Sequence, residues 1–227
     1  MLRQARQVSN QDNITRRPLT SRDTKWARAI AVALARAGIR PNVISVAGSV
    51  FAAGAGGCFA LAGARTHDWG WSLLLILAAC GMQLRLLCNL FDGMVAIEGG
   101  FKTKAGELYN ELPDRFSDAF IFIGAGYSSP EFKWMSALGW TAAVLSLITA
   151  YTRALGAGMG AGQQFLGPMA KPQRMATMTV ACAVGALAPV WLILAKIIAL
   201  ALGLVAAGCL VTIFRRCRRI AREMESK

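Results

Sequence analysis

The chain is a series of long apolar stretches separated by short polar segments. Six of these stretches approach the roughly 20 residues that a helix needs to cross the hydrocarbon core of a bilayer. They lie at about 43–63, 70–97, 107–127, 133–155, 173–190 and 191–213. Only Pro189 and its apolar neighbours separate the last two, so one long helix remains an alternative there, although it would be about twice as long as a bilayer requires. The pattern predicts an all-α, polytopic membrane protein with six transmembrane helices.

The segment ahead of the first apolar stretch predicts a helix that lies on the membrane surface. Thr20 and Ser21 are suitable caps for its start, and Gly38 suits its end. Apolar residues recur at spacings of four, four and three, and the basic residues lie largely elsewhere on the helical wheel. The apolar face consists of Trp26, Ile30, Leu34 and Ala37. Because tryptophan favours the depth of the lipid headgroups, an N-terminal amphipathic interfacial helix is a better interpretation than a solvated basic helix.

Basic residues are concentrated at the two ends of the chain. Nine of the 25 Lys and Arg residues lie in residues 1–40, and six lie in residues 215–227. The formal net charge is +13, but basic clusters that flank apolar stretches indicate topology and contact with anionic membrane lipids rather than binding of nucleic acid. We expect a cytoplasmic basic segment over 1–42, a six-helix transmembrane domain over 43–213, and a basic cytoplasmic tail over 214–227.

Composition and loop charge indicate the orientation of the predicted spans. Hydrophobic residues make up 55% of the chain and its mean hydropathy is +0.44, which is more apolar than a soluble domain of this length needs. With six spans, the loops over 98–106 and 156–172 share a side with both termini, and these segments hold most of the Lys and Arg outside the spans. The positive-inside rule then predicts that both termini are cytoplasmic. A bacterial inner membrane is the expected location.

Polar side chains gather where the second predicted span ends and the third begins. Arg85, Asn89 and Asp92 share one helical face, because they are four and three residues apart. Further polar residues follow at helical spacing along the third span: Glu107, Asn110, Glu111, Asp114 and Asp118. Ionisable groups within spans are normally buried with a partner or placed for function. This cluster could hold a divalent cation through oxygen ligands, and a solvated acidic patch with Arg85 and Arg115 as counter-ions remains the alternative.

This segment resembles the motif of the CDP-alcohol phosphotransferase family, which is D-x-x-D-G-x-x-A-R, eight residues, then G-x-x-x-D-x-x-x-D. The chain reproduces the spacing with Asn89, Asp92, Gly93, Ala96, Ile97, Gly106, Asn110 and Asp114. The resemblance implies a membrane enzyme of phospholipid synthesis. Such an enzyme moves a phosphatidyl or other substituted phosphate group from a CDP-alcohol, such as CDP-diacylglycerol, to an acceptor hydroxyl and releases CMP. The resemblance also implies a homodimer.

The resemblance carries roles to individual positions within 43–213, which it makes a catalytic domain. Asn89, Asp92, Asn110 and Asp114 occupy the positions that bind Mg²⁺ or Mn²⁺. Asp114 also occupies the position of the base that activates the acceptor hydroxyl. A lack of side chains at Gly93 and Gly106 would let a nucleotide approach the backbone. The expected nucleotide- and diphosphate-binding set is Gly93, Ala96, Gly106 and Arg85.

Three positions depart from the family motif. Asn89 and Asn110 replace aspartates, and Ile97 replaces the arginine. The two amides remove two negative charges, for which Glu107, Glu111 and Asp118 are candidate compensations, and Arg85 is a candidate substitute for the missing arginine. A changed metal preference, a changed reaction and lost catalysis remain open. The alternative to an enzyme is a catalytically degenerate family member that binds lipid or nucleotide as a membrane partner.

A second basic set follows the fourth predicted span. Arg153, Lys171 and Arg174 either recognise a phosphate of the acceptor or anchor the protein by the positive-inside rule, and the resemblance favours phosphate recognition. The arginines after Phe214 predict a stop-transfer and lipid-anchoring tail. A transporter is a weaker interpretation, since transporters place their sites near the middle of the membrane and this acidic cluster lies at one end.

Overall fold

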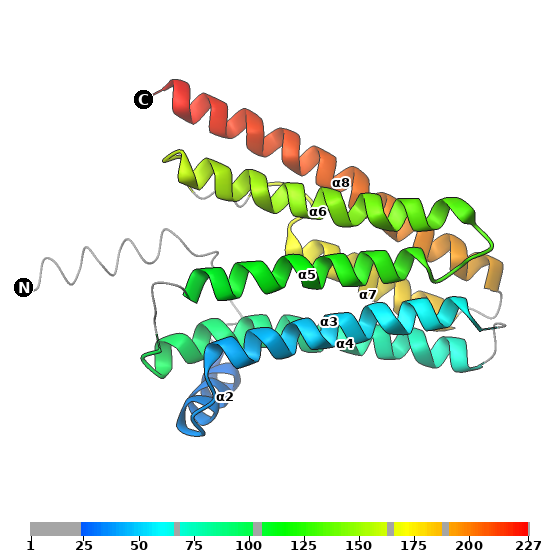
Figure 1. Ribbon diagram of the computed structural model, residues 1–227, viewed down its shortest axis with the longest axis horizontal. Coiled ribbons are helices and arrows are strands. Elements are labelled where there is room, and N and C mark those ends of the chain that lie inside the picture. The colour runs from blue at the N-terminus through cyan, green and yellow to red at the C-terminus, as the bar shows by residue number, and fades with distance from the viewer. Residues whose placement is uncertain (1–23, 66–68, 102–105, 163–165, 188–190, 227) are drawn as a thin grey trace, which may run out of the picture.

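The computed structural model describes residues 24–65, 69–101, 106–162, 166–187 and 191–226, and α-helix is the only regular secondary structure within them. The helices are α2 (Lys25–Arg36), α3 (Pro41–Gly63), α4 (Trp69–Glu98), α5 (Gly106–Gly126), α6 (Lys133–Gly158), α7 (Lys171–Leu187) and α8 (Trp191–Glu225) (Figure 1). The predicted all-α class is therefore confirmed. The six predicted apolar stretches correspond in order to α3 through α8.

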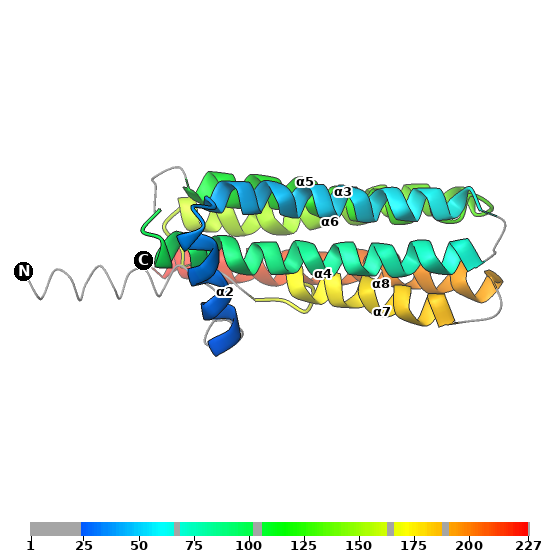
Figure 2. The ribbon, with the colours of Figure 1, turned by 90° about the horizontal axis from the view of Figure 1, so that it is seen from below.

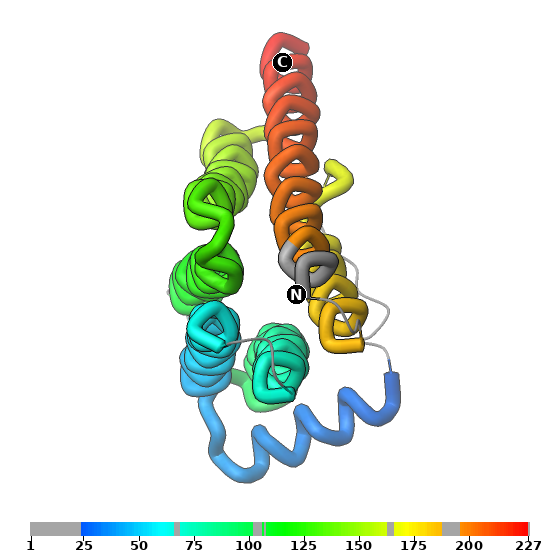
Figure 3. Tube along the Cα trace, turned by 90° about the vertical axis from the view of Figure 1, so that its right-hand side faces the viewer, coloured from blue at the N-terminus to red at the C-terminus, as the bar shows by residue number. Residues whose placement is uncertain are grey.

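The six long helices form two layers. One layer contains α3, α5 and α6, and the other contains α4, α7 and α8 (Figures 2 and 3). Helix α2 lies across the bundle, against α4 (Figure 3). It lies at the same end of the bundle as the last residues of α8 (Figure 1). Because α5 contacts α3 and α6 within its layer and α8 across the layers, the motif-bearing helix has a central position.

Four of the described helical segments are long and apolar enough to cross a membrane. They are Pro41–Gly63, Trp69–Glu98, Lys133–Gly158 and Lys196–Glu225. Helix α5 has 21 residues but carries the polar motif, and α7 has 17 residues and begins with two basic residues in its first four. The apolar helices support an integral membrane protein. Length and composition alone thus give four spans rather than six among the described residues.

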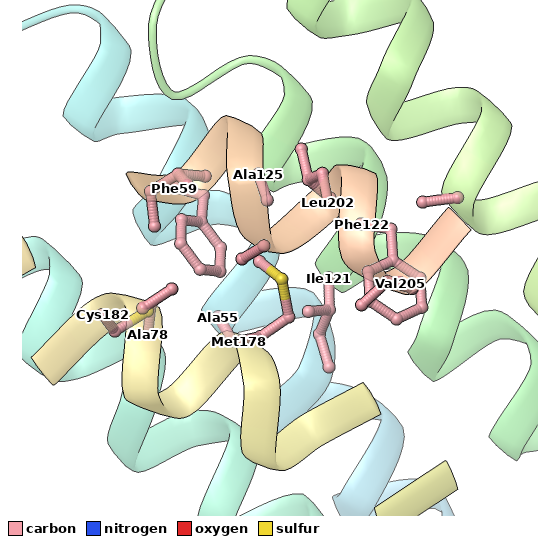
Figure 4. Packing of buried hydrophobic residues seen from close by; sticks show 14 of the residues in the cluster. Ala55, Phe59, Ala78, Ile121, Phe122, Ala125, Met178, Cys182, Leu202 and Val205 are labelled. Atoms are coloured by element: carbon pink, nitrogen blue, oxygen red, sulfur yellow. The ribbon is translucent and has the colours of Figure 1, made fainter. Parts of the chain in front are cut away.

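The two layers enclose an apolar core. Phe59 of α3, Phe122 of α5, Met178 of α7 and Leu202 of α8 are completely buried there (Figure 4). Within one layer, α3 and α5 meet backbone to backbone, since a Cβ atom added at Gly56 would collide with the carbonyl oxygen of Phe120. Small residues permit this close approach between helices in a membrane. The contact fixes α5 against α3.

A glycine follows the end of helix α2, as the sequence predicts. Gly38 has a φ of +74°, in the left-handed region that favours glycine after a helix. The predicted caps Thr20 and Ser21 lie outside the described residues, and the described helix follows Thr24. Ala27 and Ala31 are buried against α4. Trp26 and Ile30 of the predicted apolar face stay 51% and 41% exposed, because the small alanines give the closer packing surface.

Helices α7 and α8 are separate, with residues 188–190 outside the description. Helix α8 continues to Glu225, so the predicted tail is helical over 214–225. Its arginine-rich sequence has good helix propensity. Arg216 also fixes it by donating hydrogen bonds to the carbonyl oxygens of Thr149 at 2.6 Å and Leu166 at 2.9 Å.

Candidate functional site

A small pocket lies where α3, α4 and α5 meet. The ends of α4 and α5 that carry the motif form two of its walls, and the beginning of α3 forms the third. Five residues predicted for the site line it, together with five that were not predicted. The lining consists of Ser45, Gly48, Arg85, Cys88, Asn89, Asp92, Asn110, Pro113, Asp114 and Ser117. The structure therefore brings the two halves of the motif together in one small cavity.

Asn89 connects the two halves of the motif by hydrogen bonds. Its side-chain Nδ2 donates to Oδ1 of Asn110 at 3.2 Å and to both carboxylate oxygens of Asp114 at 3.2 Å. A carboxylate at position 89 could make none of these bonds, because it has no hydrogen to donate. The amide therefore lets α4 approach Asp114 with an attraction where a second carboxylate would repel.

Asp92 is held by donors from two helices. Its carboxylate accepts a hydrogen bond from Oγ of Ser45 at 2.8 Å and another from the backbone N–H of Gly93 at 2.5 Å. The side chain is 3% exposed. Burial of a charged carboxylate is tolerated only with such partners. Asp92 is thus oriented before any ligand arrives.

The acids of α5 meet the predicted basic residues one by one. Glu111 contacts Arg153 of α6 at 2.5 Å. Asp114 contacts Lys171 of α7 at 2.5 Å, and Asp118 contacts Arg174 of α7 at 2.5 Å. Helix α7 begins part of the way along the bundle, so its first turn lies at the depth of these acids (Figure 2). The set predicted for acceptor phosphate therefore lies beside the motif.

A buried ion cluster lies one turn beyond the motif. Asp118 is 2% exposed and binds Arg85 of α4 at 2.6 Å through one oxygen and Arg174 through the other. Arg85 also lies 3.6 Å from Oδ1 of Asp114. Three helices are thus joined by one carboxylate. The formal charges of the cluster cancel, since three carboxylates face three cations: Asp92, Asp114 and Asp118 with Arg85, Lys171 and Arg174.

The donor set fits a divalent ion only in part. Within the described chain, no group of three or more His, Cys, Asp or Glu side chains is arranged to hold a metal. The pocket offers the carboxylates of Asp92 and Asp114, and amide oxygens from Asn89 and Asn110. Amide and carboxylate oxygens are acceptable ligands for Mg²⁺, which commonly completes its shell with substrate phosphate and water. These residues therefore fit an ion that arrives with a phosphorylated substrate.

Several predicted residues lie apart from the pocket lining, as far as the structure describes it. Gly93 contacts Asp92, whereas Ala96 and Gly106 are half-buried near the helix ends. Ile97, at the position of the motif arginine, is 53% exposed. The side chain of Glu107 lies outside the described part. Arg85 lines the pocket, and its role as a substitute for the motif arginine stays a prediction.

Sequence reasoning missed the contribution of α3. Ser45 binds Asp92, and Ser49 lies 3.2 Å from Ser117 of α5 by their hydroxyl oxygens. Ser45 and Ser49 are four residues apart in an otherwise apolar stretch, so a small polar stripe was visible. Its partners were hidden, because hydroxyl groups are common in membrane helices and usually bond to their own backbone.

The fold and the pocket define a class: helical membrane proteins with a transverse first helix, a six-helix bundle and a polar pocket between its second and third helices. Three solved structures that share this fold are of phosphatidylinositol phosphate synthase from Mycobacterium tuberculosis. With CDP-DAG bound, that enzyme is 22% identical over 87% of this chain and 94% of its own, with a TM-score of 0.72. The complex with manganese and citrate gives 22% identity, coverages of 86% and 88%, and a TM-score of 0.71.

The apo form of the same enzyme gives 23% identity, coverages of 85% and 94%, and a TM-score of 0.68. No family model matches the chain, and the comparison with curated proteins gives no match. The likeness to the solved structures shows the fold. The resemblance first seen in the motif is therefore confirmed at the level of the fold.

Proposed function

We propose that this protein is a CDP-alcohol phosphotransferase that acts on CDP-diacylglycerol or another CDP-alcohol. It transfers the phosphatidyl or substituted phosphate group to a hydroxyl acceptor and releases CMP. The observation that carries the proposal is the meeting of Asn89, Asp92, Asn110 and Asp114 in one pocket. Support comes from the fold, which it shares with a phosphatidylinositol phosphate synthase that was solved with CDP-DAG bound.

The proposed topology has six spans, α3 to α8, with α2 at the cytoplasmic membrane surface. Exposed Trp26 and Ile30 on α2 support contact with lipid. Both termini are cytoplasmic in a bacterial inner membrane, and the basic ends contact anionic lipids. We divide the chain into a cytoplasmic basic segment over 1–42, a catalytic transmembrane domain over 43–213 and a basic cytoplasmic part over 214–227. The protein acts as a homodimer.

In the proposed reaction, the acceptor hydroxyl oxygen forms a bond to the phosphorus of the CDP-alcohol that carries the donor alcohol, such as diacylglycerol. The bond from that phosphorus to the CMP oxygen breaks, CMP leaves with the electron pair, and the hydroxyl proton passes to the carboxylate of Asp114. Arg85 and Arg153 hold phosphate oxygens. Mg²⁺ or Mn²⁺, held by Asp92 and Asp114 with the amide oxygens of Asn89 and Asn110, would neutralise the diphosphate.

The acceptor subsite is proposed to lie beside Arg153, Lys171 and Arg174. Each of these side chains contacts one acid of α5 within 2.5 Å. A phosphate on the acceptor would share these cations with the acids rather than need new ones. Glu111 and Asp118 are proposed to restore part of the negative charge that Asn89 and Asn110 lack. Glu107 is proposed to do the same because of its position in the sequence.

The test is CMP release from purified protein in lipid nanodiscs. CDP-diacylglycerol is supplied with Mg²⁺ or Mn²⁺ and a panel of hydroxyl acceptors that includes phosphorylated and plain alcohols. CMP formation is expected with wild type, and Asp114→Asn is expected to lower it by about a hundredfold or more because the proton acceptor is lost. The proposal would be contradicted if protein that elutes as a folded species released no CMP with any combination of CDP-lipid and acceptor.

A second candidate function is a non-catalytic protein that binds lipid or nucleotide. The observation that favours it is the hydrogen bonding of Asn89 to both oxygens of Asp114, which occupies the proposed base. Binding of CDP-diacylglycerol without turnover supports this candidate. Turnover with any acceptor excludes it.

A further inference from the structure

Lys171 occupies a special position beside the pocket. Its Nζ atom lies 2.5 Å from Oδ2 of Asp114, and the two side chains are only 18% and 14% exposed. Lys171 is the first residue of α7, which begins part of the way along the bundle rather than at its end (Figure 2). An ammonium group at this depth is costly unless it is paired. The ion pair between Lys171 and Asp114 is therefore part of the pre-formed structure of the site.

The ammonium group completes the charge balance of the buried cluster. Without Lys171, three carboxylates would face only Arg85 and Arg174, and both of these already bind Asp118. The cluster would then keep one net negative charge beside the pocket, with only Arg85, at 3.6 Å, still facing Asp114. Asn89 adds neutral hydrogen bonds to the same carboxylate, which need no counter-ion. The resident side chains thus neutralise Asp114 without an added cation.

A second observation points to an anionic ligand. Arg85 lines the pocket and is 1% exposed, and its Nη2 atom is used by Asp118. Its Nε and Nη1 atoms are buried and have no hydrogen-bond partner among the described residues. A buried guanidinium with free N–H groups is suited to phosphate oxygens. The pocket therefore offers unpaired N–H groups of Arg85 as well as the ammonium group of Lys171.

We propose that Lys171 is the resident cation of the pocket, and that a diphosphate-linked nucleotide binds there through Lys171 and Arg85 without a preloaded divalent ion. A divalent ion then enters with the diphosphate and serves the transfer step. The nucleotide part of this inference rests on the proposed function. The part that concerns Lys171 and Asp114 is independent of it.

The independent part is tested by Mn²⁺ binding without nucleotide. Free Mn²⁺ is measured by its electron paramagnetic resonance signal during titration of the full-length protein in nanodiscs made of neutral lipid. Loss of the ammonium group in Lys171→Met leaves the cluster with one net negative charge, so Mn²⁺ affinity is expected to rise by about tenfold or more over wild type. The matched control is Lys133→Met, which removes an exposed lysine at the start of α6 and is expected to match wild type.

Two results of the titration would overturn the role of Lys171. One is tight Mn²⁺ binding by wild type, and the other is equal affinity in wild type and Lys171→Met. Elution volume and helical circular dichroism of the variant are compared with wild type. If Lys171→Met does not fold, Lys171→Arg keeps the charge and is expected to fold and to show the weak Mn²⁺ binding of wild type. Tight binding by Lys171→Arg would also overturn the role.

The nucleotide part is tested by equilibrium binding of labelled CDP-diacylglycerol, once in EDTA and once in Mn²⁺. Wild-type affinity is expected to differ by less than about threefold between the two conditions. Lys171→Met is expected to bind about tenfold more weakly in EDTA and to recover on addition of Mn²⁺, since the ion supplies the lost charge. Wild-type binding that disappears in EDTA and returns with Mn²⁺ would contradict the inference.

Failure of the proposed function and failure of the inference about Lys171 give different results. If no variant binds CDP-diacylglycerol in either condition, the proposed ligand of the pocket is wrong and the nucleotide part fails with it. The Mn²⁺ titration still decides the role of Lys171 in that case. If CDP-diacylglycerol binds and turns over only with Mn²⁺ already bound, the proposed function stands and the inference fails.

Discussion

At position 89 an amide stands among acids, and its hydrogen atoms decide how the two motif helices meet. Asn89 donates to Asn110 and to both oxygens of Asp114, each at 3.2 Å. The family motif has aspartate at positions 89 and 110. Two amides therefore convert a cluster that would repel itself into one that holds together. A substitution usually regarded as a loss of ligands is, at this residue scale, also a gain of internal bonding.

Asn89→Asp is expected to destabilise the protein in the absence of a divalent ion. The new carboxylate would face Asp114 at hydrogen-bond distance and remove three donated bonds, at a cost of about 1–3 kcal/mol. Addition of Mn²⁺ is expected to restore stability, because an ion that binds only the folded state raises its free energy of unfolding. Thermal unfolding in nanodiscs measures both effects. Asn42→Asp, at an exposed position of α3, is the control and should leave stability unchanged in both conditions.

Asp118→Asn is expected to be among the most destabilising single changes in the bundle. It leaves the guanidinium groups of Arg85 and Arg174 buried without their shared carboxylate, which costs about 3–5 kcal/mol. The comparison variant is Glu111→Gln, whose side chain is 41% exposed and whose loss should cost less than about 1 kcal/mol. Denaturant midpoints in detergent compare the two. Equal midpoints would show that the buried cluster contributes no more than a surface ion pair.

At the scale of elements, the apolar pattern predicted the order and approximate limits of the helices. Membrane helices are long because the bilayer is thick, so their limits follow from residue counts. The depth at which α7 begins does not follow from residue counts. It brings Lys171 and Arg174 to Asp114 and Asp118, and it depends on packing between helices that are far apart in sequence. The pairing of these residues was therefore not predictable, although the residues themselves were. The role of Ser45 was missed for the same reason.

The contact between α3 and α5 has a matched pair of tests in adjacent residues. A methyl group at Gly56 would collide with the backbone of α5, whereas nothing lies within 4 Å of a Cβ atom at Gly57. Gly56→Ala is expected to destabilise the protein by about 1–3 kcal/mol through overpacking. Gly57→Ala is expected to be neutral or to stabilise by up to about 1 kcal/mol, since alanine is the better helix former. Thermal unfolding that ranks the two variants in the opposite order would refute the backbone contact.

At the scale of the whole molecule, the bundle has one end that is rich in charge. The transverse helix α2 and the basic end of α8 lie at that end (Figure 1). The pocket lies toward the same end, because its lining comes from the first half of α3, the second half of α4 and the first part of α5. The charge asymmetry supports the proposal that this end faces the cytoplasm. A water-soluble acceptor and CMP would then exchange on the cytoplasmic side, while the lipid part of a CDP-lipid stays in the adjoining leaflet.

The proposed orientation is testable with a native cysteine. Cys217 is free and exposed near the end of α8. A membrane-impermeant maleimide is expected to label it in inside-out vesicles and to leave it unlabelled in intact cells, because the end of α8 is proposed to be cytoplasmic. Cys217→Ser should abolish that labelling. Labelling of Cys217 in intact cells would reverse the orientation.

The backbone contact at Gly56 also limits how the pocket can adapt. Helix α5 carries Asn110 and Asp114, and it cannot slide along α3 without separating two backbones in contact. Adaptation to different ligands is therefore left to the identity of the side chains that line the pocket rather than to movement of α5. A rigid frame lined by exchangeable side chains is well suited to divergence. New head groups could be accommodated by exchange of single side chains around a scaffold that stays the same.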